Sequence, residues 1–244
     1  MSTQNKKKNN LINLTLIGLF AALCYIALML FFFPFGQMFI HFGNLIVVTA
    51  ALLIGGWQGG LAGSIGMGLF DLFNGHADSS PKTFLLKFLI GLTVGLVYNI
   101  FKNRKKYPTV TLLISGSASL ILGIGIILYN TIKKNSMGID LIVLFSLFIV
   151  IGIFCIVFAF LNKKLSQKTA AATVGAACGM LVNILGETLW KTVQFSLAGS
   201  NVSAAFTASA LAQGSTLINA AISIIGGVIL FVSLEKPFNK IISK

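Results

Sequence analysis

The sequence predicts an all-α polytopic membrane protein that crosses the bilayer eight times, with both termini in the cytoplasm. Of its 244 residues, 56% are hydrophobic and only 9% are charged, whereas soluble domains carry about a quarter charged residues. Apolar runs of the length that a membrane span needs, about 20 residues, recur along the chain between short polar breaks. A soluble enzyme and a nucleic-acid-binding domain are therefore excluded, although the net charge is +13.

The apolar runs predict the eight helices in order: 11–33, 39–56, 60–75, 83–101, 110–130, 139–161, 169–194 and 211–234. Residues 1–10 then form a basic cytoplasmic tail, and residues 11–244 form a single transmembrane domain. The first run is longer than the apolar core of a signal peptide and has no clear cleavage site, so we expect it to be retained. The glycine pairs Gly55-Gly56 and Gly59-Gly60 predict a tight reversal between the second and third helices.

The positions of the basic residues predict the orientation. Lys and Arg gather in the segments 6–8, 102–106, 163–168 and 236–244. With eight crossings, all four segments lie on the same side of the membrane. Because Lys and Arg are enriched in cytoplasmic loops, we expect this side to be the cytoplasm.

Polar residues near the opposite, outer face form three groups. They are His41 and Asn44; Asp71, Asn74, His76, Asp78, Lys82, Thr83 and Lys87; and Asn183, Glu187, Lys191 and Gln194 with Gln213. Ionisable residues inside a membrane are costly and usually face the interior of a bundle or a cavity. The three groups therefore predict a polar site that opens to the outside.

The charged residues of these groups allow two interpretations. The four polar residues of the seventh helix recur at intervals of four, four and three, so they share one helical face. An ion pair between Glu187 and Lys191 would only stabilise the end of that helix, whereas the longer polar stripe favours a binding surface. Lys87 would extend to the membrane surface, pair with Asp71 across the bundle, or contact a ligand, and the last two interpretations are slightly favoured.

Motifs for catalysis and for metal binding are absent from the sequence. With two histidines, no i,i+4 His pair and no Cys-x-x-Cys spacing, we do not expect His41, Asp71, His76 and Asp78 to hold a metal. The chain has no Walker A loop, no Gly-x-Ser-x-Gly turn and no His-Glu-x-x-His helix. We therefore expect a binding protein that is not an enzyme and that has no cofactor of its own.

Small residues recur four positions apart in several predicted helices, as in Gly59 and Gly63, Gly91 and Gly95, and Gly175 and Gly179. This spacing lets helices approach closely in lipid, and inside a bundle it indicates internal packing. On the first helix, Gly18 and Ala22 could instead contact a separate membrane protein.

The ordered polar and glycine residues resemble one family. They are His41-Phe42-Gly43-Asn44, the pairs Gly55-Gly56 and Gly59-Gly60, Gly66, Asp71-Leu72, Pro81-Lys82-Thr83, Lys87 and Gly91. This set resembles the substrate-binding S components of energy-coupling factor (ECF) transporters, in the riboflavin-type group. The resemblance is strongest over residues 38–98, extends over 11–33, and recurs more loosely over 169–236.

The resemblance implies an S-component-like bundle of six core helices in the cell membrane of a prokaryote. Since eight spans are counted, residues 110–161 would be an inserted helical hairpin. The protein would capture a vitamin or vitamin precursor from outside, such as riboflavin, a pyridoxine-type vitamin, hydroxymethylpyrimidine or a similar heterocycle. A transmembrane T component and two ATPase subunits would be its partners, and only the ATPases would use ATP.

The resemblance also implies where the ligand and the partner bind. Loops at Phe35–Ile40, Asn74–Ser80 and Phe195–Leu211 would close over the ligand, and Gly18 with Ala22 would contact the T component. The expected hydrogen-bond or charge partners of the ligand are Asn44, Asp71, Asn74, Lys87, Asn183, Glu187 and Gln213. Trp190 and Phe195 would supply stacking surface, or Trp190 would instead belong to the aromatic belt at the membrane interface.

Two other functions remain as alternatives. A stand-alone secondary transporter could couple uptake to protons through Asp71 and Glu187. An intramembrane enzyme acting on a lipid would require a nucleophile, an acid and a metal set, and the sequence does not supply them.

Overall fold

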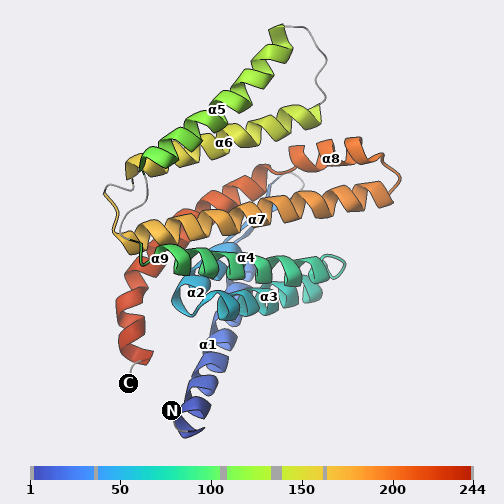
Figure 1. Cartoon of the computed structure of the whole chain (residues 1–244). Coiled ribbons are helices and arrows are strands. Elements are labelled where there is room, and N and C mark those ends of the chain that lie inside the picture. Colours follow the sequence, from blue (N-terminus) through green and yellow to red (C-terminus); the bar gives the residue numbers. More distant parts are fainter. Residues whose placement is uncertain (1–2, 36–37, 105–108, 133–138, 162–163, 243–244) are drawn as a thin grey trace. The chain divides into compact units, whose positions relative to one another are not determined.

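The computed structural model describes residues 3–35, 38–104, 109–132, 139–161 and 164–242. Within these ranges the chain forms helices joined by short turns, together with one β-hairpin (Figure 1). The elements are α1 (Thr3–Leu30), β1 (Phe32–Phe35), β2 (Met38–His41), α2 (Gly43–Leu53), α3 (Gly56–Phe73), α4 (Ser80–Phe101), α5 (Thr109–Ile132), α6 (Ile139–Leu161), α7 (Gln167–Leu197), α8 (Val202–Leu211) and α9 (Gly214–Ile242).

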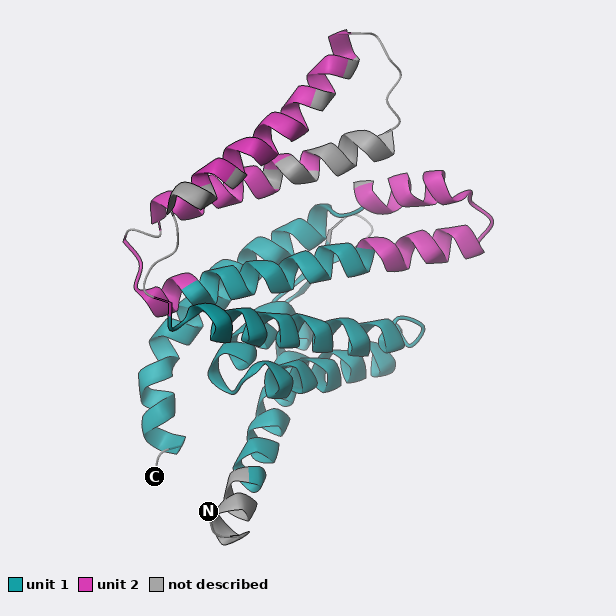
Figure 2. Ribbon diagram, in the orientation of Figure 1, with its two compact units in different colours: residues 1–103, 171–187, 212–244 teal, residues 104–170, 188–211 magenta. Residues whose placement is uncertain are grey.

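The chain divides into two compact units (Figure 2). Unit 1 comprises residues 1–103, 171–187 and 212–244, so it contains α1 to α4, the middle of α7 and α9. Unit 2 comprises residues 104–170 and 188–211, which include α5, α6, the end of α7 and α8. The hairpin predicted at 110–161 corresponds to α5 and α6 and belongs entirely to unit 2. Its status as an insertion stays a prediction.

The segment between α1 and α2 is a β-hairpin rather than two helix ends and a loop. Strands β1 and β2 pair in antiparallel fashion, with Phe32 opposite His41 and Phe33 opposite Ile40. The predicted helices 11–33 and 39–56 are therefore wrong at these ends, and the expected loop at 35–40 is largely strand, with residues 36–37 outside the described ranges. A continuous apolar run does not distinguish strand from helix, and the aromatic residues here pack as a strand pair.

Other boundaries also differ from the prediction. The chain reverses at Gly55, where φ is +103°, and α3 already begins at Gly56, so the second glycine pair lies inside a helix. The tail 1–10 is mostly the first turns of α1. The expected loop 195–211 contains the end of α7 and the whole of α8. Helix α6 covers the predicted range 139–161.

Not every predicted span has the length of a membrane crossing. Four described helical segments are long and apolar enough to cross: 10–30, 80–101, 167–197 and 214–242. Helix α2 has 11 residues, which at 1.5 Å per residue is about half of the hydrocarbon thickness. The count of eight spans therefore remains a prediction, and α2 alone does not supply one of them.

Glycine residues allow close packing inside unit 1. A Cβ atom on Gly91 would clash with the backbone of Gly60, and one on Gly95 would clash with the backbone of Gly56. Helices α3 and α4 are therefore in backbone contact, as the small-residue spacing predicts. This packing holds the first turns of α4 in a defined position beside the end of α3.

Helix α1 presents a different surface at its small residues. A Cβ atom added at Gly18 would meet nothing within 4 Å, and both Gly18 and Ala22 are exposed. Large apolar neighbours on the same helix, among them Leu14, Leu19 and Ile26, are exposed as well. The other face of α1 is buried through residues such as Phe20 and Cys24.

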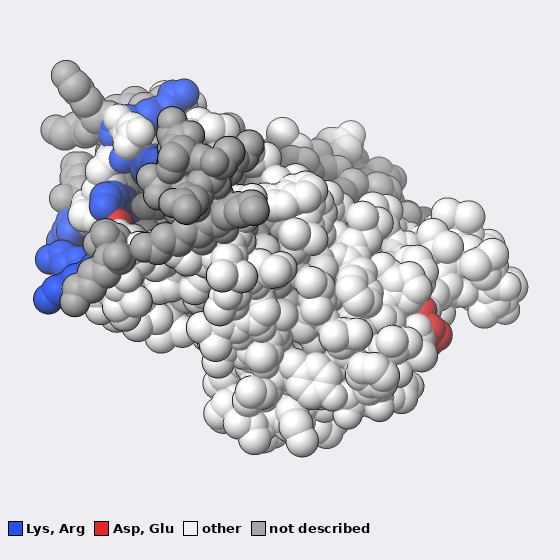
Figure 3. All heavy atoms as spheres, turned by 90° about the horizontal axis from the view of Figure 1, so that it is seen from below, with Lys and Arg blue, Asp and Glu red and all other residues white. Residues whose placement is uncertain are grey.

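Basic residues lie at the ends of helices that point away from the outer polar groups. Lys102 and Arg104 follow α4, and Lys236 and Lys240 lie in the last turns of α9. The rings of Phe20 in α1 and Phe238 in α9 lie 6.4 Å apart, which places this end of α9 beside α1. On the face drawn in Figure 3, Lys and Arg gather at one end. The basic residues at 105–106, 163 and 244 lie outside the described ranges.

Candidate functional site

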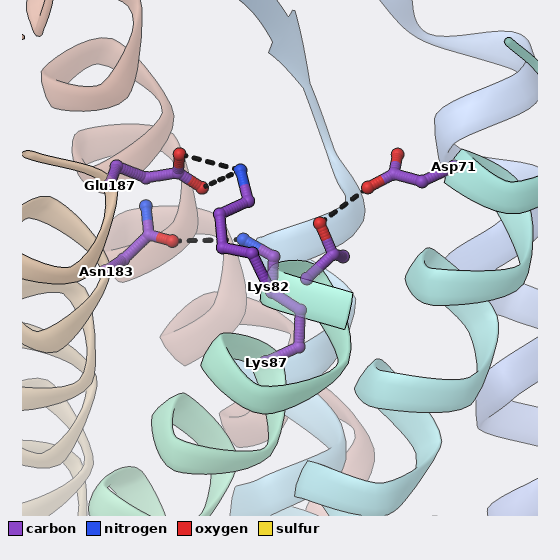
Figure 4. Close-up of polar contacts among 6 residues, drawn as sticks. Asp71, Lys82, Lys87, Asn183 and Glu187 are labelled. Carbon is purple, nitrogen blue, oxygen red and sulfur yellow. Dashed lines mark hydrogen bonds and ion pairs between the residues drawn. The ribbon is translucent and has the colours of Figure 1, made fainter. Parts of the chain in front are cut away.

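The candidate site is built on the first two turns of α4. Pro81 occupies the first turn of this helix, a position that suits proline because its N–H would have no intrahelical partner. The following residues Lys82, Thr83 and Lys87 carry polar groups on different sides of α4. Figure 4 shows both lysines reaching towards α7, while Asp71 lies on the opposite side.

Lys82 connects α4 to α7 through an ion pair. Its Nζ atom lies 2.9 Å from Oε2 and 3.1 Å from Oε1 of Glu187. The two side chains are 15% and 8% exposed, so water screens this pair less than it screens a surface pair. The contact fixes the first turn of α4 against α7.

Lys87 lies one turn deeper and has a neutral partner. Its Nζ atom donates a hydrogen bond of 3.0 Å to Oδ1 of Asn183, and the side chain is only 3% exposed. Lys87 therefore does not extend to the membrane surface. Pairing with Asp71 is also wrong, because no carboxylate among the described residues lies within ion-pair distance of Lys87. The spacing of Asn183 and Glu187 correctly placed them on one face of α7.

Asp71 instead binds the neighbouring turn of α4. Oγ1 of Thr83 donates a hydrogen bond of 2.5 Å to Oδ2 of Asp71. A second contact between the same helices joins Oγ of Ser80 to the carbonyl oxygen of Gly68 at 2.8 Å. Helix α4 is thus bonded to α3 on one side and to α7 on the other.

Asn219 of α9 fastens the β-hairpin. Its Oδ1 accepts a hydrogen bond of 3.0 Å from the backbone N–H of His41, and its Nδ2 donates one of 2.8 Å to the carbonyl oxygen of Phe39. The Asn219 side chain thus pairs backbone groups on the edge of β2 that has no neighbouring strand among the described residues. The stacked rings of Phe32 and Phe39, 4.0 Å apart, hold the two strands together.

Two buried polar atoms beside this hairpin have no partner among the described residues. They are Nδ1 of His41 and Oδ1 of Asn44, and the side chain of Asn44 is only 1% exposed. His41 lies in β2, outside the candidate spans. Burial, followed by the charge of Lys87, lowers the pKa of His41 from 6.5 to about 3, so its ring is neutral near pH 7.

The remaining predicted residues lie in other places. Asn74 is exposed at the end of α3, where it donates to the carbonyl oxygen of Phe70 at 2.8 Å. Gln213 is buried immediately before α9. Trp190 and Phe195 belong to the part of α7 in unit 2, and their position relative to the site stays a prediction.

The structure shows three residues in positioning contacts that the sequence-based prediction did not assign to them. Lys82 and Thr83 were recognised as outer polar residues but were not among the expected ligand contacts. Asn219 was missed altogether, although a lone Asn inside the apolar run Leu217-Ile218-Asn219-Ala220 is a usable signal.

The arrangement offers binding groups rather than a reactive centre. Unit 1 brings together ammonium, carboxylate and amide groups. It also contains buried polar atoms without a partner among the described residues, including Nδ1 of His41 and Oδ1 of Asn44. Within the described part of the chain, no group of three or more His, Cys, Asp or Glu residues could hold a metal ion. These groups can hydrogen-bond a polar molecule that is otherwise surrounded by apolar helices.

The ion pair between Lys82 and Glu187 gives the first prediction. Lys82→Met should lower the free energy of unfolding by about 3 kcal/mol, because it removes the ammonium group that lies against a buried carboxylate. Lys82→Met combined with Glu187→Met should restore most of this loss. Unfolding of the detergent-purified variants, followed by temperature, measures both effects. A double variant no more stable than Lys82→Met would contradict the pairing.

Comparison with known proteins now identifies the family. The model of the family described as "ECF-type riboflavin transporter, S component" matches residues 8–139. The match covers more than half of the chain, contains most of α1 and the whole of α2 to α4 with their site residues, and continues through α5. No curated protein and no solved structure matches the chain. The chain therefore belongs to the family of ECF-type riboflavin transporter S components.

Proposed function

We propose that this protein is the capture subunit of an ECF-type importer, which binds a vitamin or vitamin precursor outside the cell. The observation that carries the proposal is the polar cluster of unit 1, in which α4 bonds to α3 and α7 beside unpartnered polar atoms. The family match supports vitamin uptake. The T component and two ATPase subunits would supply the energy.

The distribution of charge supports an outward-facing cluster. Helix α4 carries Lys82 and Lys87 at its beginning and is followed by Lys102 and Arg104. Its 22 residues are about as long as the hydrocarbon core is thick. Because exposed basic residues favour the cytoplasm, the cluster at the other end of α4 faces the outside, and both termini are cytoplasmic.

The ligand contacts that we propose are those gathered in unit 1. Asn44 and Lys87 have hydrogen-bonding capacity that the described protein does not use. Asn183 and Glu187 position the two lysines, and Asp71 positions Thr83. Contacts from Asn74, Gln213 and Trp190 remain predictions from the family resemblance.

The exposed face of α1 is the proposed contact with the T component. The other small-residue pairs in unit 1 pack against neighbouring helices, as Gly59 does against Ala51 and Gly179 against Val94. Gly18 alone among these pairs has open space where its Cβ would be, and Ala22 is exposed beside it. A second membrane helix can therefore approach α1 closely at this point.

A substitution at Asn44 should affect ligand binding without lowering the stability of the ligand-free protein. Asn44→Leu should leave the stability of the ligand-free protein unchanged or slightly higher, because it removes a buried amide oxygen that has no hydrogen-bond partner among the described residues. It should abolish the thermal stabilisation by the ligand, which is about 2.7 kcal/mol at 100 times the Kd. Thermal shift of the detergent-purified protein against a panel of vitamins and precursors measures both quantities.

A matched control is Ser64→Ala. The Ser64 hydroxyl is buried and donates to the carbonyl oxygen of Phe84 at 2.7 Å, and Ser64 is not one of the proposed ligand contacts. This variant should lose about 1 kcal/mol of stability and keep the ligand response. A full ligand response in Asn44→Leu would contradict the proposed site.

Uptake distinguishes the proposed importer from a proton-coupled transporter. Co-expressed with a T component and two ATPases, the chain should import its ligand only while the ATPases are active. Gly18→Leu should prevent assembly of the complex, whereas Gly125→Leu should not, because both glycines have open space around an added Cβ but Gly125 lies on α5. Co-purification and uptake of labelled ligand are the measurements.

Uptake that depends on the proton gradient instead of the ATPases would contradict the proposed importer. Uptake that continues with ATPases lacking their phosphate-binding lysine, and that collapses when an uncoupler removes the proton gradient at constant ATP, would favour the secondary transporter. Asp71 and Glu187 would then be the residues to examine as proton carriers.

A further inference from the structure

Lys87 differs from Lys82 in having no carboxylate partner. Both ammonium groups lie on the first two turns of α4, but Lys82 is paired with Glu187 whereas Lys87 donates to the neutral amide of Asn183. The carboxylate of Asp71 is bonded to Thr83. Among the described residues, the buried ammonium of Lys87 therefore makes one hydrogen bond, to the amide oxygen of Asn183.

This arrangement is costly in the ligand-free protein. An ammonium group has three N–H donors, and one of those of Lys87 is used. Its side chain is 3% exposed, so bulk water has little access to the other two. A buried charge without a counter-charge is strongly unfavourable unless a partner arrives.

Unpartnered atoms on β2 and α2 mark the same region as a binding surface. Helix α2, which carries Asn44 in its first turn, packs directly against α4, the helix that carries Lys87. Nδ1 of His41 and Oδ1 of Asn44, three residues further on, both lack partners among the described residues. Together with Lys87, they give unit 1 unused hydrogen-bonding groups on β2, α2 and α4.

We propose that the ligand carries an anionic oxygen group, a carboxylate or a phosphate, which binds Lys87 while its polar body contacts Asn44 and His41. The proposal rests on the function proposed above and narrows its substrate class. An anionic oxygen group accepts hydrogen bonds from the two unused N–H donors and places a negative charge in contact with the ammonium. A neutral ligand can accept hydrogen bonds at Lys87 but brings no charge to pair with it.

Matched ligand pairs test the proposal, because their members differ mainly in charge. Suitable pairs are nicotinate and nicotinamide, pantothenate and pantothenol, biotin and biotinamide, and riboflavin 5′-phosphate and riboflavin. Affinity is measured by calorimetry on the detergent-purified full chain. In at least one pair, the anionic member should bind about 10- to 100-fold more tightly, the range for a hydrogen bond to a charged group. The responding pair shows whether the group is a carboxylate or a phosphate.

Variants of two lysines on the same helix provide the control. Lys87→Met should reduce the affinity for the anionic member to that for the neutral one, and Lys87→Arg should keep part of the preference. Lys102→Met removes the same charge at the other end of α4, where the ammonium lies 5.4 Å from the centre of the Tyr98 ring. It should leave both affinities unchanged.

The outcomes separate this proposal from the function on which it rests. Equal or tighter binding of the neutral member in every responding pair would overturn the anionic ligand and leave the capture function standing. Loss of the charge preference in Lys102→Met as well would also overturn it, because the preference would then be a property of the overall charge. Failure of every member of every pair to bind would overturn both proposals.

Discussion

The polar bonds of the first two turns of α4 organise unit 1. Lipid offers no hydrogen bonds to a buried ammonium, hydroxyl or carboxylate group, so each must find a partner within the protein. Lys82 and Lys87 find theirs on α7, and Thr83 finds its partner on α3. The same three side chains that could disrupt a membrane helix therefore set the positions of α3, α4 and α7 around the candidate site.

Close packing and polar bonding have separate roles in this unit. Backbone contact between α3 and α4 at their glycines leaves little freedom for one helix to slide along the other. Asn219 ties the β-hairpin to α9. The outward face of α1 takes no part in either and keeps Gly18 and Ala22 exposed. Ligand capture and partner contact can thus use different surfaces of one small bundle.

The sequence predicted features that depend on a single helix, such as its bounds and the residues that share one of its faces. It did not predict which residues of different helices contact one another. The range of α6 and the shared face of Asn183 and Glu187 follow from apolar length and from the 3.6-residue period. The partners of the two lysines depend on the rotation of α4 about its axis, which no local pattern determines. The β-hairpin was missed because its apolar run has no period. Helix α8 was missed because the family resemblance implied a loop at 195–211, although the four Ala residues of α8 favour a helix.

A structure of the protein with its bound ligand tests the central claim most directly. Our account predicts that polar atoms of the ligand lie within hydrogen-bond distance of Nζ of Lys87 and of the Asn44 side chain, with the bonds from α4 to Asp71 and Glu187 preserved. A ligand held only by residues of unit 2, with Lys87 still bonded to Asn183 alone and Asn44 still without a partner, would contradict it.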